Sequence, residues 1–187
     1  MTKNQSIKET FSVICRYAMY YGALLGLFWV FRYTFQIIGG AGVSDRFLFL
    51  FYLLNIGTLL LIYMFYNKFR YADPDNPRGL LECLVFSVMM CFFASFLEGV
   101  LMYAHFQFID PAYFSHMIEP VMRSLDSMSK PGMVSDADFE QSKQLTAVIF
   151  SSKITYIIIE FIKNILLGLF MGLLLHFLVN NMKKKTN

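Results

Sequence analysis

The chain has 187 residues, of which 57% are apolar and 18% aromatic. Apolar residues make up only about half of an ordinary soluble domain, so this composition excludes a typical soluble globular protein. The formal net charge of +3 is too small to favour a nucleic-acid partner. The three cysteines lie within or beside apolar stretches, where no disulfide framework is expected.

Four apolar stretches follow one another, and each is long enough to cross a hydrocarbon core of about 30 Å. They are residues Tyr17–Ile38, Phe47–Tyr66, Leu80–Ile109 and Ile154–Val179. The lipid bilayer is therefore the expected surrounding of the chain. We predict an all-α, multi-pass membrane protein with one transmembrane domain over residues 1–187. Its fold is a four-transmembrane-helix up-and-down bundle with an extracytoplasmic amphipathic helical insertion between spans three and four.

Basic residues beside the spans predict the orientation, because cytoplasmic segments carry an excess of Lys and Arg. One side of the membrane collects Lys3, Lys8, Arg16, Lys68, Arg70, Arg78, Lys183, Lys184 and Lys185. The other side has fewer, in a longer and more acidic segment: Arg46, Arg123, Lys130, Lys143 and Lys153. We therefore expect both termini in the cytoplasm.

The first span raises an alternative, since secretory signals also begin with basic residues and an apolar stretch. This stretch is longer than that of a signal and carries Arg32, so we expect an uncleaved span. The glycine-rich residues 38–45 predict an antiparallel hairpin of spans one and two. Asn76 followed by Pro77 predicts the N-cap and the first residue of span three.

The long connection 110–153 contains an amphipathic pattern. Asp110 followed by Pro111 predicts a helix start, and apolar residues then recur at three- and four-residue steps to about residue 129. Two alternatives stay open for this helix. It lies at the extracytoplasmic membrane interface or packs on the bundle, which we favour, or it closes over the bundle as a lid. Ser135 predicts the start of a second helix that runs into span four.

Motifs for metal binding and catalysis are weak. His116 and Glu119 share a helix face, but a zinc site needs three or four ligands, so we interpret the two as residues of a wet face. The sequence has no His-Glu-x-x-His, Gly-x-Ser-x-Gly, phosphate-binding loop or Cys-x-x-Cys motif. We expect no metal, no cofactor and no catalytic residue, although the absence of motifs does not remove the enzyme hypothesis.

Charged residues inside the spans are the most specific feature, because a lone charge there costs about 3 kcal/mol and usually pairs. Four lie in the extracytoplasmic halves of the spans: Arg32, Glu98, Glu160 and Lys163. Counted from the span ends, Arg32 matches Glu160 in depth. Glu98 matches Lys163 at a greater depth. We therefore predict a neutral polar cluster built from these two pairs, with a Glu160–Lys163 pair at i,i+3 as an alternative.

Span three also carries a stripe of small or polar residues at helical spacing: Ser87, Cys91, Ala94, Glu98 and His105. Such a stripe usually marks the face that packs. It can also line a water-filled path through the membrane, in which Glu98 and His105 would pass protons or ions along. We favour packing.

Small residues at four-residue steps predict close helix approach. They are Ala18, Gly22 and Gly26 in span one, and Gly168 and Gly172 in span four. The simplest arrangement is an antiparallel contact of spans one and four through these ridges. The same ridges could join the chain to a membrane-protein partner or a second copy in a homo-oligomer.

The four spans, the segment Tyr20-Tyr-Gly-Ala-Leu-Leu-Gly26 and the long connection that opens with Asp110-Pro111 resemble the domain-of-unknown-function 4199 family. That family consists of small integral membrane proteins of Bacteroidota. The turn Ala72–Arg78 departs from the glycine-rich form of the family. The resemblance implies a bacterial inner (cytoplasmic) membrane location and a four-span topology, and it implies no catalytic residue.

Three classes of function follow from these observations. We favour a non-catalytic accessory or partner-binding membrane subunit, for which the charges should satisfy one another. The alternative is a small transporter or channel that uses the Glu98 and His105 face, for which a wet cavity should reach Glu98. An enzyme acting on a lipid-linked substrate ranks third.

Overall fold

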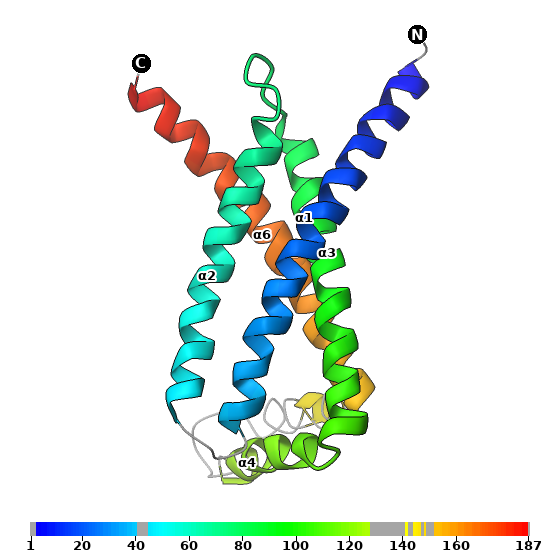
Figure 1. Cartoon of the computed structure of the whole chain (residues 1–187), viewed down its shortest axis with the longest axis vertical. Coiled ribbons are helices and arrows are strands. Elements are labelled where there is room, and N and C mark those ends of the chain that lie inside the picture. The colour runs from blue at the N-terminus through cyan, green and yellow to red at the C-terminus, as the bar shows by residue number, and fades with distance from the viewer. Residues whose placement is uncertain are drawn as a thin grey trace. The chain divides into compact units, whose positions relative to one another are not determined.

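The computed structural model describes residues 3–40, 45–127, 141, 144–146, 148 and 152–186. Its elements are α1 (Lys3–Gly40), α2 (Asp45–Arg70), α3 (Leu80–Ala104), the π-helix η1 (His105–Ile109), α4 (Tyr113–Ser127) and α6 (Lys153–Thr186) (Figure 1). The described part of the chain contains no strand. The predicted all-α fold is confirmed.

Four helices are long and apolar enough to cross a membrane: Lys8–Ile38, Phe49–Arg70, Leu80–Ile109 and Lys153–Val179. These bounds lie within a few residues of the predicted spans, except that the first helix begins about two and a half turns earlier, at Lys8 rather than Tyr17. The start of α1, the turn after α2 and the end of α6 lie at one end (Figure 1), as an up-and-down bundle requires. The chain has the architecture of a multi-pass membrane protein.

The chain divides into two compact units, each described here by itself. The first unit comprises Met1–Glu98 and Phe161–Asn187, and the second comprises Gly99–Glu160. The first unit therefore contains α1, α2, most of α3 and most of α6, and the second contains η1 and α4.

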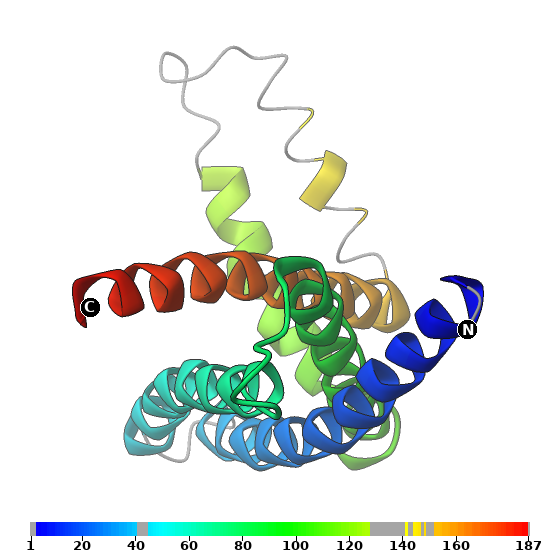
Figure 2. The same ribbon diagram turned by 90° about the horizontal axis from the view of Figure 1, so that it is seen from above.

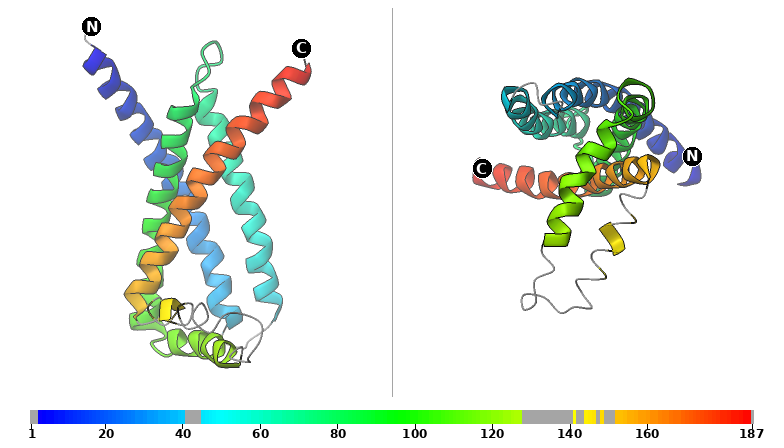
Figure 3. Two further views of the ribbon diagram at one scale, coloured as in Figure 1. Left: turned by 180° about the vertical axis from the view of Figure 1, so that it is seen from behind. Right: turned by 90° about the horizontal axis from the view of Figure 1, so that it is seen from below.

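In the first unit, α3 is the helix on which α1 and α6 both pack. Gly22 lies against the backbone of Met90, and Gly168 lies against the backbone of Ser87. Figure 2 shows α1 and α6 passing on different sides of α3, and Figure 3 shows α6 crossing α3 obliquely. The expected direct contact of the two glycine ridges is therefore wrong, because each ridge faces α3.

The small face of α3 accommodates both ridges. Ser87, Cys91 and Ala94 are fully buried, so the first three residues of the predicted stripe lie in the packed interior. Gly26 contacts Ala94 and Leu97 from one side. Small residues on both partners let the helix backbones approach closely, which is the main source of helix association in lipid.

The turn between α2 and α3 differs from its prediction. Asn76 and Pro77 belong to the turn rather than to the helix, and α3 begins at Leu80. The turn closes through the amide of Arg78, which donates to the carbonyl of Arg70 at 3.1 Å. The first helical bond then runs from the Cys83 amide to the Gly79 carbonyl at 3.1 Å. Because the Arg78 amide is bonded to Arg70 across the turn, the helix starts after Arg78, three residues later than the cap motif indicated.

In the second unit, α4 begins at Tyr113, two residues after the predicted start at Pro111, and packs through aromatic rings. The Asp110 carboxylate accepts the Ala112 and Tyr113 amides at 3.1 and 3.0 Å, so it starts the helix. Phe114 is 7% exposed and lies 5.3 Å from the Phe106 ring and 5.8 Å from the Tyr156 ring, between centroids. The N-terminal part of α4 is thus a packed element of its unit. The predicted cap at Ser135 lies outside the described residues.

Replacing Lys153 by methionine should loosen the second unit by about 1.5 kcal/mol. The Lys153 ammonium donates to the carbonyl of Phe106 at 2.6 Å, and hydrogen bonds from charged donors contribute about that much. Hydrogen exchange of the amides at residues 106–113 should become faster. Lys153→Arg keeps the donor and serves as the control. Equal protection in K153M and the wild-type protein would contradict the assignment.

Candidate functional site

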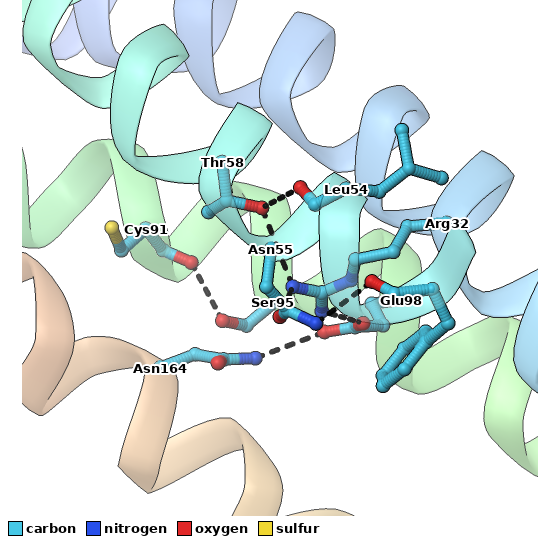
Figure 4. Close-up of polar contacts among 9 residues, drawn as sticks. Arg32, Leu54, Asn55, Thr58, Cys91, Ser95, Glu98 and Asn164 are labelled. Carbon is cyan, nitrogen blue, oxygen red and sulfur yellow. Dashed lines mark hydrogen bonds and ion pairs between the residues drawn. The ribbon is translucent and has the colours of Figure 1, made fainter. Parts of the chain in front are cut away.

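A polar network lies inside the first unit and takes side chains from all four long helices. Its members are Arg32 of α1, Asn55 and Thr58 of α2, Glu98 of α3 and Asn164 of α6 (Figure 4). We call this set the polar network. Each member interrupts an apolar helix, so each needs a partner inside the bundle.

The centre of the polar network is an ion pair between Arg32 and Glu98. The Arg32 Nη2 atom lies 2.8 Å from Glu98 Oε1, and the two side chains are 12% and 8% exposed. The second carboxylate oxygen, Oε2, accepts a hydrogen bond of 2.9 Å from Asn164 Nδ2. Both oxygens of Glu98 are therefore bound, one to a cation and one to an amide.

The other half of the Arg32 guanidinium faces α2. Its Nη1 atom donates to Asn55 Oδ1 at 2.8 Å and to Thr58 Oγ1 at 3.3 Å. The guanidinium carbon lies 5.6 Å from the centre of the Trp29 ring and 5.5 Å from that of Phe51. Aromatic rings at this distance attract a cation, so Arg32 is held by charge, hydrogen bonds and ring contacts together.

The side-chain donors of Asn55 and Thr58 form hydrogen bonds with backbone carbonyls of α2 itself. Asn55 Nδ2 donates to the Phe51 carbonyl at 2.9 Å, and the Thr58 hydroxyl donates to the Leu54 carbonyl at 3.4 Å. On α3, the Ser95 hydroxyl donates to the Cys91 carbonyl at 2.7 Å (Figure 4). These bonds leave the acceptor atoms of Asn55 and Thr58 for the Nη1 atom of Arg32, whose Nε atom is buried without a hydrogen-bond partner among the described residues.

This arrangement differs from the pairing predicted by depth. Arg32 pairs with Glu98, whereas depth counting assigned Arg32 to Glu160 and Glu98 to Lys163. Lys163 lies on the exposed surface of α6, one residue before the buried Asn164, and Glu160 is half-buried and belongs to the second unit. The helix periodicity explains the change, because neighbouring residues on α6 point in different directions.

Glu98 and His105, the residues of the proposed path, belong to different units, and each is described by itself. His105 is fully buried. Its ring centre lies 4.6 Å from that of Tyr113 and 5.5 Å from that of Phe106. An aromatic shell of this kind is typical of a packed histidine.

No metal centre forms within the described residues, where no group of three or more His, Cys, Asp or Glu side chains comes together. His116 and Glu119 were considered above as two possible metal ligands. Glu119 forms an ion pair with Arg123, one helical turn further along α4. Its carboxylate is thus engaged on the wet face of α4.

Three members of the polar network were missed by sequence reasoning: Asn55, Thr58 and Asn164. Each carried a usable signal, since Asn55 and Thr58 are polar residues three apart in an apolar span and Asn164 lies in the middle of another. Residues at i and i+3 share a helix face. Neutral amide and hydroxyl groups bind the charged pair in the structure, so a search for opposite charges alone does not find them.

The chemistry available to the polar network is limited. Its one carboxylate accepts a hydrogen bond at each oxygen, its one cation is a guanidinium, and the pair sums to zero charge. The network joins side chains from four helices.

The polar network and the helices around it lie within the part of the chain that matches a known family model. The model is described as "Protein of unknown function (DUF4199)" and matches residues 20–181. No curated protein and no solved structure matches the chain. Because the family model includes at least part of each of the four long helices and far more than half of the sequence, this membrane protein belongs to the DUF4199 family.

Proposed function

We propose that the protein is a non-catalytic subunit of a membrane assembly and acts by binding a second membrane protein or a second copy of itself. One observation carries this proposal: both carboxylate oxygens of Glu98 are bound within the bundle, to Arg32 and Asn164. A carboxylate that moves protons or ions must exchange partners with water or solute. A carboxylate bound by an arginine and an amide serves to hold helices together.

The residues around the polar network support the same function. Trp29 and Ala94 are fully buried, and Ser95 is 2% exposed. These side chains fill the interior next to the ion pair, so the described bundle is packed where a transport path would need space. The alternative, a small transporter or channel, requires that the Arg32–Glu98 pair open.

We place the protein in the bacterial inner membrane with both termini in the cytoplasm. The support is the distribution of basic residues beside the spans, because Lys68, Arg70 and Arg78 flank the short turn between α2 and α3. In this orientation α4 lies outside the cytoplasm, where a partner could bind it.

Flux measurements test the proposal against its alternative. The purified chain is reconstituted into liposomes with an internal pH dye or a potential-sensitive dye, and proton and cation flux are followed. We expect no flux above that of empty liposomes. Flux that Glu98→Gln abolishes and Lys163→Gln retains would contradict the proposal and establish transport through Glu98.

A second measurement, the mass of the complex extracted from native membranes, tests whether the protein is a subunit of an assembly. The protein is extracted with its surrounding lipid, and particle mass is measured without crosslinking. We expect one discrete species heavier than the 21.7 kDa chain by a fixed multiple or by one partner in a fixed ratio. A population made only of single chains would contradict a subunit role.

A further inference from the structure

The turn between α2 and α3 contains an arginine, Arg78, that could bind an anionic group. Arg78 forms no ion pair within the described residues, and its buried Nε atom has no hydrogen-bond partner. A guanidinium has five donors and normally binds a carboxylate or a phosphate. Arg78 is therefore available for an anionic group.

Aromatic rings hold this guanidinium in place. Its central carbon lies 4.5 Å from the centre of the Phe69 ring and 5.8 Å from that of Tyr17. The Phe69 ring in turn stacks on the Phe86 ring at 4.1 Å, with 9° between the planes. A stacked guanidinium loses little freedom when it binds an anion, because its position is already set.

A hollow opens beside Arg78, and the acidic residue Glu82 also lines it. It measures about 480 Å³ and is lined by Asn76, Pro77, Arg78, Gly79, Leu81 and Glu82. Glu82 and Arg78 do not pair with each other, since no ion pair joins them. One cation and one anion, neither in an ion pair among the residues that the structure describes, thus line the same hollow, which suits a ligand that carries both charges.

The position of the hollow limits the ligand to the membrane surface. The second apolar helix ends at Arg70 and the third begins at Leu80, so the turn lies where lipid headgroups lie. Leu81, at the wall of the hollow, is an apolar side chain that is 73% exposed. Asp73 and Asp75 lie exposed in the same turn and disfavour ligands with net negative charge.

We propose that this hollow binds the headgroup of a zwitterionic phospholipid with a primary ammonium group, namely phosphoethanolamine. The phosphate contacts the Arg78 guanidinium, and the ammonium contacts the Glu82 carboxylate. The acyl chains extend along the apolar side chains near Leu81. The lipid site is separate from the polar network and stands whether or not the protein is a subunit.

Native mass spectrometry with defined lipids tests this site. The protein is delipidated in detergent and titrated with phosphatidylethanolamine, phosphatidylcholine or phosphatidylglycerol of the same chain length. Phosphatidylethanolamine should bind most tightly, and Arg78→Gln should weaken its binding by about tenfold or more, since charge-assisted bonds contribute that much. Glu82→Gln should remove the preference for phosphatidylethanolamine over phosphatidylcholine while phosphate-dependent binding remains.

Matched controls separate this site from general attraction to the membrane. Lys68→Gln removes an exposed cation near the turn that does not line the hollow, and it should leave the lipid preference unchanged. Inorganic phosphate and soluble glycerophosphoethanolamine should not compete at millimolar concentration. An equal effect of R78Q and K68Q, a preference for phosphatidylglycerol, or binding of inorganic phosphate in place of lipid would each overturn the proposal.

Discussion

Glu98→Ala is expected to destabilise the four-helix unit by about 3 kcal/mol, the cost of an unpaired charge in the membrane. The substitution leaves the Arg32 guanidinium buried without its anion, and it leaves Asn164 Nδ2 without its acceptor. The unit should unfold at lower denaturant concentration in lipid nanodiscs. The chain should also accumulate less in the membrane, because misassembled spans are degraded.

The control for this prediction is Lys163→Ala. Lys163 was predicted to share the charge cluster, but it lies on the exposed surface of α6, and removing a charge from an exposed position of a membrane span lowers the cost of inserting that span, so this variant should lose less than about 1 kcal/mol of stability. Both variants remove one charge from a membrane helix. If they destabilise the protein equally, the effect reflects charge in the membrane and not the ion pair.

Gly22→Leu and Gly168→Leu are each expected to cost about 3 kcal/mol, at the upper end for overpacked sites. Even the Cβ atom of a side chain at position 22 would lie 2.7 Å from the Met90 carbonyl oxygen and 2.8 Å from Phe93 Cβ. At position 168 it would lie 2.7 Å from the Ser87 carbonyl oxygen. Backbone atoms cannot give way as side chains do, so α1 or α6 must move away from α3.

Gly99→Ala is the matched control on α3 itself. Its Cβ would meet only Ile157 Cγ2, at 3.5 Å, which is ordinary van der Waals contact. Alanine also favours a helix over glycine by about 1 kcal/mol, so G99A should match or exceed the wild-type stability. Unfolding in nanodiscs compares the variants. A mild effect of G22L and G168L, similar to that of G99A, would refute close packing on α3.

The spans and fold class could be predicted from the sequence because they depend on length and hydropathy alone. Each span exceeds what a bilayer core requires, and no soluble fold tolerates four such stretches. The start of α4 was also predictable, since Asp110 and Pro111 act locally. Local chemistry and bilayer thickness determine these features without reference to the neighbouring helices.

The partner of Arg32 could not be derived by counting residues. Depth counting treats the helices as upright, whereas α6 crosses α3 obliquely (Figure 3). A tilted helix advances less per residue across the membrane, and tilt is set by packing rather than by hydropathy. Arginine also has a long side chain that reaches across a turn, so equal counts do not imply contact.

The helix that the glycine ridges contact could not be predicted from the sequence either. A small-residue pattern shows which face of a helix can approach another, but it does not show which helix approaches. Ser87, Cys91 and Ala94 pointed to the partner, because they give α3 a third face of small residues in the same half of the bundle as the two glycine ridges. Gly26 and Gly168 pack against that face from two sides.

The central claim is that Arg32 and Glu98 satisfy each other and serve to hold the helices together. Replacing both with apolar residues, in Arg32→Met with Glu98→Leu, tests it most directly through a double-mutant cycle in nanodiscs. Removing both charges of a buried pair costs far less than removing one. The double variant should therefore recover at least about half of the stability lost in each single variant. A double variant whose stability loss equals the sum of the two single losses would show that the two side chains are not coupled, and would contradict the account.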